Sequence, residues 1–436
     1  MTTETTKKTE VGSYFVANYP PFSAWSPDYA EQVTERLNGA PANAAPVGLY
    51  AHIPFCRKRC KFCYFRVYTD KTKTDRDRYL DALGKEWELL GQCPVLGGRP
   101  LNFIYVGGGT PSALNEQQIT TFGELLRKHW SWDDVEEFTF ECEPGTLTED
   151  KVQLIRDIGV TRLSLGVENF SDEVLKENGR AHLSPEVYTA YDWIRARDFS
   201  QVNIDLISGM VGETEANWKD SVRRAIELSP SSVTIYQMEL PFNTVYSKGV
   251  LSDGEDSGVA DWPTKRRWVR YAFEQLAEAG YAQSSAYTMA KPGERAGFVY
   301  RDALWHGADM IGTGVASFGY VQGAHMQNLD SFGPYVESCE RGELPIYRGY
   351  SSTAHQQLVR EMILQMKLGK LDGAPFSEKF GVDIFDRFAD GFQALEREGM
   401  LTRENGGIRL TDEGFLQVDA CLPRFYEPEH QRVRYT

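Results

Sequence analysis

The pattern of apolar and polar positions changes at residue 47 into a regular alternation of two kinds of segment. Short runs rich in β-branched and aromatic residues end in glycine or polar residues, and a longer segment with helical periodicity follows each run. Nearly continuous apolar strands that alternate with amphipathic helices are typical of a parallel sheet covered by helices. The pattern therefore predicts an α/β fold, a partial (β/α)6 barrel, with strands at 47–53, 102–107, 137–142, 162–167, 202–207 and 232–237.

The segments on either side of this alternation have different patterns. A polar tail leads into an aromatic arm, GSYFVANYPPFSAW, whose prolines argue against regular structure. Two helical segments, the second at 383–398, and a hairpin with an Asn-Gly-Gly turn near the C-terminus predict a winged-helix-like module. The glycine-rich stretch 249–258 predicts a surface loop. We therefore divide the chain into a tail and arm (1–46), a barrel domain with an extension (47–350) and a C-terminal domain (351–436).

Composition and charge exclude several classes of protein. The hydrophobic fraction of 41% is that of a globular protein, and the net charge of −15 disfavours binding to nucleic acid or to anionic membranes. Residues 351–436 hold 14 Asp and Glu against 11 Lys and Arg, so we expect this module to cover the barrel opening rather than to bind DNA. No segment has the pattern of a signal peptide or of a membrane span. We expect a monomer in the reducing cytoplasm.

Three of the seven cysteines lie within eight residues, in the stretch CRKRCKFC. A structural zinc site needs four ligands, usually from two separated pairs, and no second pair exists in the sequence. A disulfide framework is typical of short secreted chains with an even number of cysteines. The remaining hypothesis is an iron–sulfur cluster held at three corners by Cys56, Cys60 and Cys63, with the fourth iron open to a small ligand.

Polar and glycine residues follow the predicted strands at the ends where ligands gather in parallel α/β folds. A single one of these features is weak, since GGGTP alone is equally consistent with a tight turn. Their convergence on one edge of the sheet, beside the cysteines, indicates a functional site. The features are Gly107–Pro111, Glu141 and Glu143, Glu168 and Asn169, Asp205, and Gln237–Glu239.

These residues carry a resemblance to a known family. CRKRCKFC is similar to the CxxxCxxC signature of radical S-adenosylmethionine (SAM) enzymes. LYAHIPFC, GGGTP, FECEP, LSLGVENF, GRAH and NIDLISGM resemble the HemN-like branch, named after oxygen-independent coproporphyrinogen III oxidase. The resemblance covers most of 47–350 and extends more weakly into the C-terminal module.

The resemblance implies a role for individual residues. The three cysteines would hold a [4Fe–4S] cluster whose open iron chelates SAM, and reduction would cleave SAM to methionine and a 5′-deoxyadenosyl radical. One SAM would contact Tyr50, Phe62, Gly108, Gly109, Thr110, Glu141, Glu168, Arg180 and Asp205. A second SAM or the substrate would contact Met238 and Phe318. The catalytic acid or base is not identified by the resemblance, and His325 is a weak candidate for proton transfer.

Three departures from the family pattern affect the expected function. The chain has Glu168 where the oxidase has glutamine, Phe65 where the oxidase has a further cysteine, and FVYRDALW where heme chaperones have HNRYW. The chain resembles more closely the methylases, cyclopropanating enzymes and heme-opening enzymes of the branch. We therefore expect radical modification of a tetrapyrrole or another flat conjugated substrate, by methyl transfer, cyclopropanation or oxidation. The alternatives are coproporphyrinogen III oxidase and a non-catalytic heme-binding chaperone.

Five cations surround the cysteines in this acidic chain: Arg57, Lys58, Arg59, Lys61 and Arg66. A solvated loop is one interpretation. The other is a docking patch for an acidic electron donor of the flavodoxin or ferredoxin type, because a local positive patch offsets repulsion between two acidic proteins.

Overall fold

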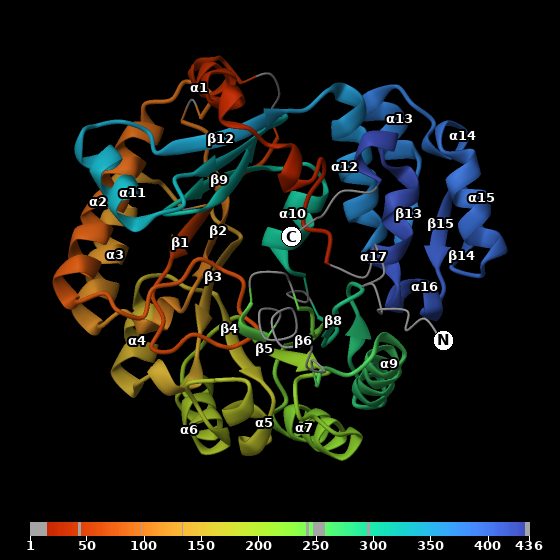
Figure 1. Ribbon diagram of the computed structural model, residues 1–436, viewed down its shortest axis with the longest axis horizontal. Coiled ribbons are helices and arrows are strands. Elements are labelled where there is room, and N and C mark those ends of the chain that lie inside the picture. Colours follow the sequence, from red (N-terminus) through yellow and green to blue (C-terminus); the bar gives the residue numbers. More distant parts are fainter. Residues whose placement is uncertain are drawn as a thin grey trace, which may run out of the picture. The chain divides into compact units, whose positions relative to one another are not determined.

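The computed structural model describes residues 15–41, 45–96, 98–132, 134–240, 244–246, 258–293 and 297–431 (Figure 1). The predicted polar tail and all but the last residue of the predicted loop 249–258 lie outside the described residues. The described chain forms two compact units. One is Trp25–Ser351, and the other combines the described residues of Met1–Ala24 with those of Ser352–Thr436.

The larger unit is built on a curved sheet whose first six strands are parallel and follow one another in chain order. Each observed strand matches its predicted run to within one residue at either end. The prediction of an α/β fold with a partial barrel is confirmed, because the sheet curves without closing and ends at β12 and β7. The strands are β1 (Val47–Ile53), β2 (Leu101–Gly108), β3 (Glu137–Cys142), β4 (Arg162–Glu168), β5 (Gln201–Ser208) and β6 (Ser232–Gln237).

Helices cover the convex face of this sheet (Figure 1). Thr72, Asn115 and Thr214 each begin a helix by accepting a hydrogen bond from the backbone N–H three residues later. The covering helices are α2 (Lys73–Gly91), α3 (Glu116–His129), α4 (Glu149–Asp157), α5 (Asp172–Glu177), α6 (Ser184–Arg195), α7 (Glu215–Leu228) and α9 (Trp262–Glu278).

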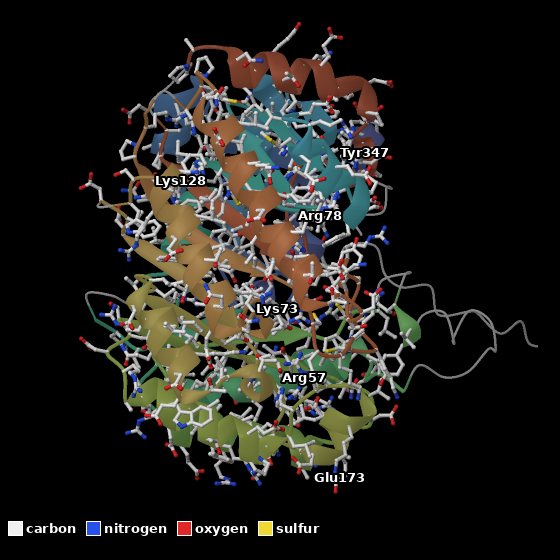
Figure 2. The ribbon with its side chains drawn as sticks, turned by 90° about the vertical axis from the view of Figure 1, so that its left-hand side faces the viewer. Arg57, Lys73, Arg78, Lys128, Glu173 and Tyr347 are labelled. Carbon is white, nitrogen blue, oxygen red and sulfur yellow. The ribbon has the colours of Figure 1, made fainter. Side chains whose placement is uncertain are left out.

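Helices α2 and α3 pack side by side, with the Trp87 and Phe122 rings 5.6 Å apart between them. Figure 2 shows the outer face of this pair, on which Lys73, Arg78 and Lys128 are labelled. Apolar residues of both helices therefore face inward, and charged residues face solvent.

The two faces of the sheet differ in chemistry because side chains alternate along a strand. Leu163 and Leu165 are fully buried beneath the helices. Ser164, between them, points into the concave interior and donates to a carboxylate oxygen of Asp205 at 2.8 Å. Asn203 donates to the Ser164 hydroxyl at 2.9 Å. The concave interior is thus a polar, hydrogen-bonded space.

The sheet continues beyond the six parallel strands on both sides. On the β1 side, β9 (Asp309–Thr313) pairs parallel to β1, followed by antiparallel β10 (Phe318–Val321), β11 (Ala324–Asn328) and β12 (Ile346–Ser351). On the β6 side lie β8 (Thr288–Ala290) and β7 (Ala282–Gln283). The remaining helices of this unit are η2 (Pro27–Tyr29), α1 (Ala30–Asn38), η3 (Pro111–Ala113), η4 (Pro144–Thr146), α10 (Val299–Trp305) and α11 (Phe332–Glu340).

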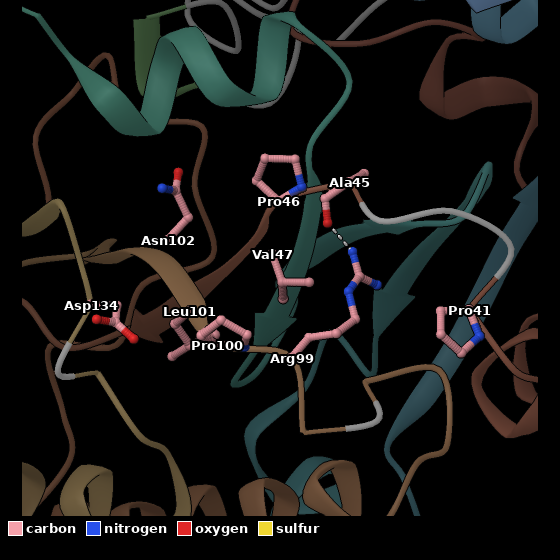
Figure 3. Close-up of a pocket in the computed structure, with 9 residues that line it drawn as sticks. All are labelled: Pro41, Ala45, Pro46, Val47, Arg99, Pro100, Leu101, Asn102 and Asp134. Carbon is pink, nitrogen blue, oxygen red and sulfur yellow. Dashed lines mark hydrogen bonds between the residues drawn. The ribbon is translucent and has the colours of Figure 1, made fainter.

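A cavity of about 680 Å³ lies at the amino ends of β1 and β2 (Figure 3). Arg99 lines it, donates to the Ala45 carbonyl oxygen and forms an ion pair with Asp309 at 2.9 Å. These bonds tie the start of β1 to the start of β9. Ligands of parallel α/β folds bind at the carboxyl ends of strands, so we assign this cavity no role in catalysis.

The smaller unit contains the predicted helices and hairpin, with one difference. The helical segment predicted at 383–398 is broken at Phe388 (φ −116°, ψ 31°) into two helices. The hairpin turns through Asn405 and Gly406, and Gly406 has the positive φ (77°) that such a turn needs. The elements are η1 (Phe22–Ala24), α12 (Ala354–Met366), β13 (Lys370–Asp372), α13 (Ala374–Phe380), α14 (Ile384–Arg387), α15 (Ala389–Arg397), β14 (Leu401–Glu404), β15 (Gly407–Leu410), α16 (Asp412–Leu416), α17 (Val418–Cys421), η5 (Leu422–Phe425) and η6 (Pro428–His430).

The described part of the aromatic arm, apart from Trp25, belongs to this smaller unit. The fully buried Lys367 donates from Nζ to the Val16 carbonyl oxygen at 2.5 Å and pairs with Asp419 at 2.8 Å. The Val16 N–H donates to the same Asp419 carboxylate. A buried ammonium needs such partners, so the arm completes the environment of Lys367.

None of the helices in the described part of the chain is long and apolar enough to cross a membrane.

Glu86 connects α2, the first of the helices that cover the sheet, to the extension of the sheet on the β1 side. Its buried carboxylate, on α2, accepts hydrogen bonds from the Gly314 N–H, the Asn328 amide and the Tyr335 hydroxyl. Burial nevertheless raises the pKa of Glu86 to about 7, because the three donors offset only part of the desolvation cost.

We expect Glu86 to make the folded state less stable as the pH rises. The folded protein keeps a proton on Glu86 that the unfolded chain releases above its ordinary pKa of 4.5. The stabilisation is therefore complete below that value and is lost as the pH rises through 7. When the pH rises from about 5 to about 8, the free energy of unfolding should fall by about 1–3 kcal/mol less in Glu86→Gln than in the wild type. Urea unfolding at both pH values measures this difference.

Glu88→Gln is the matched control, because Glu88 lies on the same helix and is exposed. The control should keep the wild-type pH dependence. Parallel pH profiles for the wild type and Glu86→Gln would contradict the prediction.

Candidate active site

The three predicted ligand cysteines lie on one loop directly after β1. The Cys56 N–H donates to the Tyr68 carbonyl oxygen at 3.0 Å, and the Cys63 N–H donates to the Cys60 carbonyl oxygen at 3.2 Å. Among the described residues, Glu427, Glu429 and His430 form the one group of three metal-ligating side chains whose ligand atoms all lie within 4.8 Å of one another. The three cysteine sulfurs do not form such a group, so at least one pair of them lies more than 4.8 Å apart, whereas 2.3 Å bonds to a single zinc ion would place sulfurs roughly 3.8 Å apart. This spacing favours a cluster over one ion.

The surroundings of the sulfur atoms also fit a metal cluster. Burial raises the pKa of Cys56 to about 12 and the pKa of Cys63 to about 11. Such thiols stay protonated and inert at neutral pH unless a metal replaces the proton. The Thr110 hydroxyl lies 3.4 Å from the Cys56 sulfur and Arg180 Nη1 lies 3.4 Å from the Cys60 sulfur, so two donors already face the sulfur atoms. The residues present therefore fit an iron–sulfur cluster.

The glycine loop after β2 packs directly against the cysteine loop. The Gly109 N–H donates to the Ile53 carbonyl oxygen at 2.9 Å, and the Thr110 N–H donates to the Phe55 carbonyl oxygen at 2.8 Å. A Cβ on Gly109 would lie 2.9 Å from the Pro54 carbonyl carbon. Gly108 has φ +116°, and a Cβ there would lie 2.4 Å from the His52 ring. Both glycines are therefore needed for the close approach of the two loops.

Three carboxyl groups from β3, β4 and β5 share the concave interior. Glu141 accepts from the Tyr105 hydroxyl at 2.6 Å and from the Gly108 N–H at 3.1 Å. Burial and the charge of Asp205 raise the pKa of Glu141 to about 7. Burial likewise raises the pKa of Glu168 to about 7, which Arg180 opposes, and raises the pKa of Asp205. Each carboxyl group contributes to the field at its neighbours, so a positively charged ligand would relieve their repulsion.

Glu168 and Arg180 link these carboxyl groups to the cysteines. Arg180 donates to the Gly166 carbonyl oxygen at 2.6 Å, and its guanidinium lies 3.6 Å from the Glu168 carboxylate. Glu168 has a left-handed backbone, with φ 64°. Non-glycine residues rarely adopt this conformation, and such strain is concentrated at functional sites.

Two further predicted SAM contacts lie at the same end of the sheet. The Tyr50 hydroxyl is 3.1 Å from His52 Nδ1, and the Tyr50 and Tyr105 rings are 5.9 Å apart. Phe62, on the cysteine loop, packs against a buried apolar cluster that includes Met210 and Met238. The loop and the carboxyl ends of β1 to β6 thus bring together the residues predicted to hold SAM.

Of the remaining predicted residues, Met238 and His325 are buried and Phe318 is partly buried, all three beside apolar or aromatic side chains. Met238 is 3% exposed in the cluster that Phe62 covers. Phe318 lies 5.6 Å from the Trp25 ring. His325 is fully buried, with its ring stacked 4.9 Å from Trp25 and 4.7 Å from Tyr320.

The sequence reasoning named Glu143 without giving it a role and missed its partner. His182 is buried, with Nδ1 2.7 Å from the Glu143 carboxylate and Nε2 3.2 Å from the Val167 carbonyl oxygen. This pair supports the turn after α5 from which Arg180 projects. The only signal in the sequence was the GRAH motif, which carried the family resemblance but no assignment for its histidine.

The basic residues of the cysteine loop prove to be partly structural. Arg57 donates to the carbonyl oxygens of Gly145 and Ala181, and Arg59 donates to the Cys63 carbonyl oxygen. Lys61 pairs with Glu177 at 2.9 Å, and Arg66 pairs with Asp330 at 3.1 Å. The loop is therefore not a uniformly free ring of positive charge.

Comparison with known proteins yields matches over nearly the whole chain. Residues 50–225 match the model of the radical SAM superfamily, and residues 353–416 match that of the HemN C-terminal domain. The chain is 26% identical to oxygen-independent coproporphyrinogen III oxidase of Escherichia coli, covering 93% of this chain and 91% of the relative. It is also 26% identical to the heme chaperone HemW of Bacillus subtilis, covering 84% of this chain and 96% of the relative.

A solved structure gives the same result. The structure of coproporphyrinogen III oxidase (HemN) from Escherichia coli, described as a radical SAM enzyme, superposes with a TM-score of 0.82 at 25% identity and covers 94% of this chain and 96% of that one. These matches confirm the predicted cofactors of the family, a [4Fe–4S] cluster and SAM. The protein is a HemN-like member of the radical SAM superfamily.

Proposed function

We propose that this protein is an enzyme that cleaves SAM reductively and uses the radical to modify a tetrapyrrole or another flat conjugated substrate. The observation that carries the proposal is the charge of the concave interior. Glu141, Glu168 and Asp205 outnumber Arg162 and Arg180, and the charges of the three carboxyl groups act on one another. SAM carries a sulfonium, an ammonium and one carboxylate, so its net positive charge complements this interior.

The chain's own residues would bind and orient the two cofactors. Cys56, Cys60 and Cys63 would hold the cluster, and Arg180 lies where it can meet a carboxylate beside Cys60. Glu141 and Asp205 would accept hydrogen bonds from an ammonium or from ribose hydroxyls. When bound, the cluster supplies one electron and SAM supplies the 5′-deoxyadenosyl radical.

The finer proposal concerns the type of reaction. The relatives are named as coproporphyrinogen oxidases and as heme chaperones, which supports a tetrapyrrole or heme as the ligand. The departures at Phe65, Glu168 and 298–305 separate the chain from both, which supports methyl transfer, cyclopropanation or oxidation of another substrate. Phe65 is half-exposed beside the third cysteine, with its ring tilted against that of Tyr64 at 4.5 Å, and would be placed to contact a flat ring. Met238 and Phe318 stay the proposed contacts of a second SAM or of the substrate.

The second candidate function is a heme-binding chaperone without SAM chemistry. The similarity to HemW supports it. The interior argues against this candidate, because it contains carboxylates suited to the positive groups of SAM and an arginine suited to its carboxylate.

The products formed from SAM test the proposal directly. After anaerobic reconstitution and reduction, we expect 5′-deoxyadenosine, with S-adenosylhomocysteine in addition if the reaction is methyl transfer. Chromatography with and without a tetrapyrrole measures both products. A reduced, cluster-loaded protein that binds heme but forms neither product would favour the chaperone.

The cluster should depend on three cysteines. We expect Cys56→Ala, Cys60→Ala and Cys63→Ala each to abolish the iron–sulfur absorbance, because the fourth iron already lacks a protein ligand. Cys142→Ala is the matched control, since Cys142 is buried at the end of β3 and belongs to no ligand set. Iron and sulfide analysis measures the outcome, and loss of the cluster in the control would refute the three-ligand assignment.

SAM binding should release protons near neutral pH. The pKa values of Glu141 and Glu168 are raised to about 7, so both groups are partly protonated there, and a cationic ligand lowers these pKa values. Glu168→Gln should reduce the release by up to about half a proton per SAM. Calorimetry in buffers of different ionisation enthalpy measures the release. Equal release in the two proteins would remove Glu168 from the SAM site.

A further inference from the structure

A small cationic pocket lies beside the cysteine loop, outside the concave interior. Its volume is about 340 Å³, near the lower limit of the roughly 300–1,000 Å³ that is usual for ligand sites. Three of its six lining residues are positively charged and none is acidic. The lining residues are Arg57, Arg76, Ala113, Gly145, Thr146 and Lys151.

Each of these cations is held in place by main-chain carbonyl oxygens. Arg76 donates to Ala113 at 2.9 Å, and Lys151 donates to Ser112 at 3.1 Å and to Thr146 at 3.0 Å. Carbonyl groups satisfy the N–H donors but do not neutralise a full positive charge. The short helices η3 and η4 therefore fix the positions of the cations and leave their charge available to an anion.

The pocket also offers unused binding capacity. Arg76 Nε is buried and has no hydrogen-bond partner within the described structure. The nearest carboxylate to Arg57 is Glu186, at 3.8 Å and half-exposed, where an ion pair contributes little. In a chain with a net charge of −15, three cations around one pocket without an acidic lining residue are unusual.

The pocket is close to the cluster ligands. Arg57 directly follows Cys56 in the chain. Phe55 directly precedes Cys56, and the Arg76 guanidinium lies 5.3 Å from its ring. The charges of Arg76 and Cys56 are near enough to interact. Arg57 lies on the exposed face in Figure 2. A molecule seated there would be separated from the cluster by little more than the cysteine loop.

We propose that this pocket is the docking site of an acidic one-electron carrier protein and that a carboxylate of the carrier binds among Arg57, Arg76 and Lys151. The inference rests on the proposed function, since it names the partner of that site. One electron leaves the carrier's reduced flavin or iron–sulfur group and reduces the cluster by one electron, with no bond made or broken. The cations offset the repulsion between two acidic proteins and steer their encounter.

Neutral substitutions in the pocket test the proposal. Arg76→Gln and Lys151→Gln remove the charge and keep an N–H donor for the carbonyl oxygens of η3 and η4. With the cluster-loaded protein and reduced flavodoxin as the carrier, we expect the double variant to be reduced at least about tenfold more slowly at low salt, with a weaker dependence on salt. Reduced methyl viologen, a small cation that the pocket does not attract, should reduce the variant and the wild type equally. Stopped-flow absorbance measures the rates.

Lys128→Gln is the matched control, because Lys128 is exposed on the same face but lies on α3 (Figure 2). It should be reduced by flavodoxin at the wild-type rate. Equal slowing with flavodoxin and methyl viologen would assign the cations to the support of the cysteine loop, and unchanged rates with both would exclude docking at the pocket. The proposal would also be overturned if inorganic phosphate inhibited reduction of the cluster while the rate did not depend on the charge of the carrier protein. That outcome would indicate a site for small anions. Failure of wild-type SAM cleavage with methyl viologen would count against the proposed function alone.

Discussion

The site depends on the main-chain hydrogen bonds that join the residues after β1 to those after β2. Gly109 and Thr110 donate to the carbonyl oxygens of Ile53 and Phe55, on either side of Pro54. These bonds fix the loop that carries Cys56 relative to the glycine loop that is proposed to contact SAM. They form only because the glycines let two backbones approach within van der Waals contact. A side chain at Gly109 would therefore disturb the cysteine loop and the glycine loop together.

The strands that build the site could be predicted because their signal is local. Each run from 47–53 to 232–237 is rich in β-branched and aromatic residues, with polar side chains mostly at alternate positions, as expected for strands with one face beneath helices and the other lining a polar interior. The pairing of β9 with β1 could not be predicted, since more than two hundred residues separate Thr313 from Ile53 and periodicity carries no information about partners. The break at Phe388 was missed for a related reason, because the apolar pattern of 383–398 continues across it.

The site residues could be placed at the sheet edge from sequence, but their environments could not. The left-handed backbone of Glu168 has no signature in LSLGVENF. The Glu143–His182 pair joins the end of β3 to the residues that follow α5, so neither residue reveals the other in the sequence. Arg57, predicted to be a docking cation, also holds two carbonyl oxygens. Whether a cation is structural or free depends on contacts that only the fold creates.

The opposite charges on the two sides of the cysteine loop explain how one site can serve two kinds of partner. The concave interior is acidic and suits cationic SAM, whereas the outer pocket is basic and suits an acidic protein. Arg180 lies between them, with one nitrogen facing the Cys60 sulfur and the other bonded at Gly166. Hydrogen bonds and positive charge near cluster sulfurs favour the reduced state. The cations would thus assist electron entry from outside, and the carboxylates would keep the cationic cofactor in place on the inside.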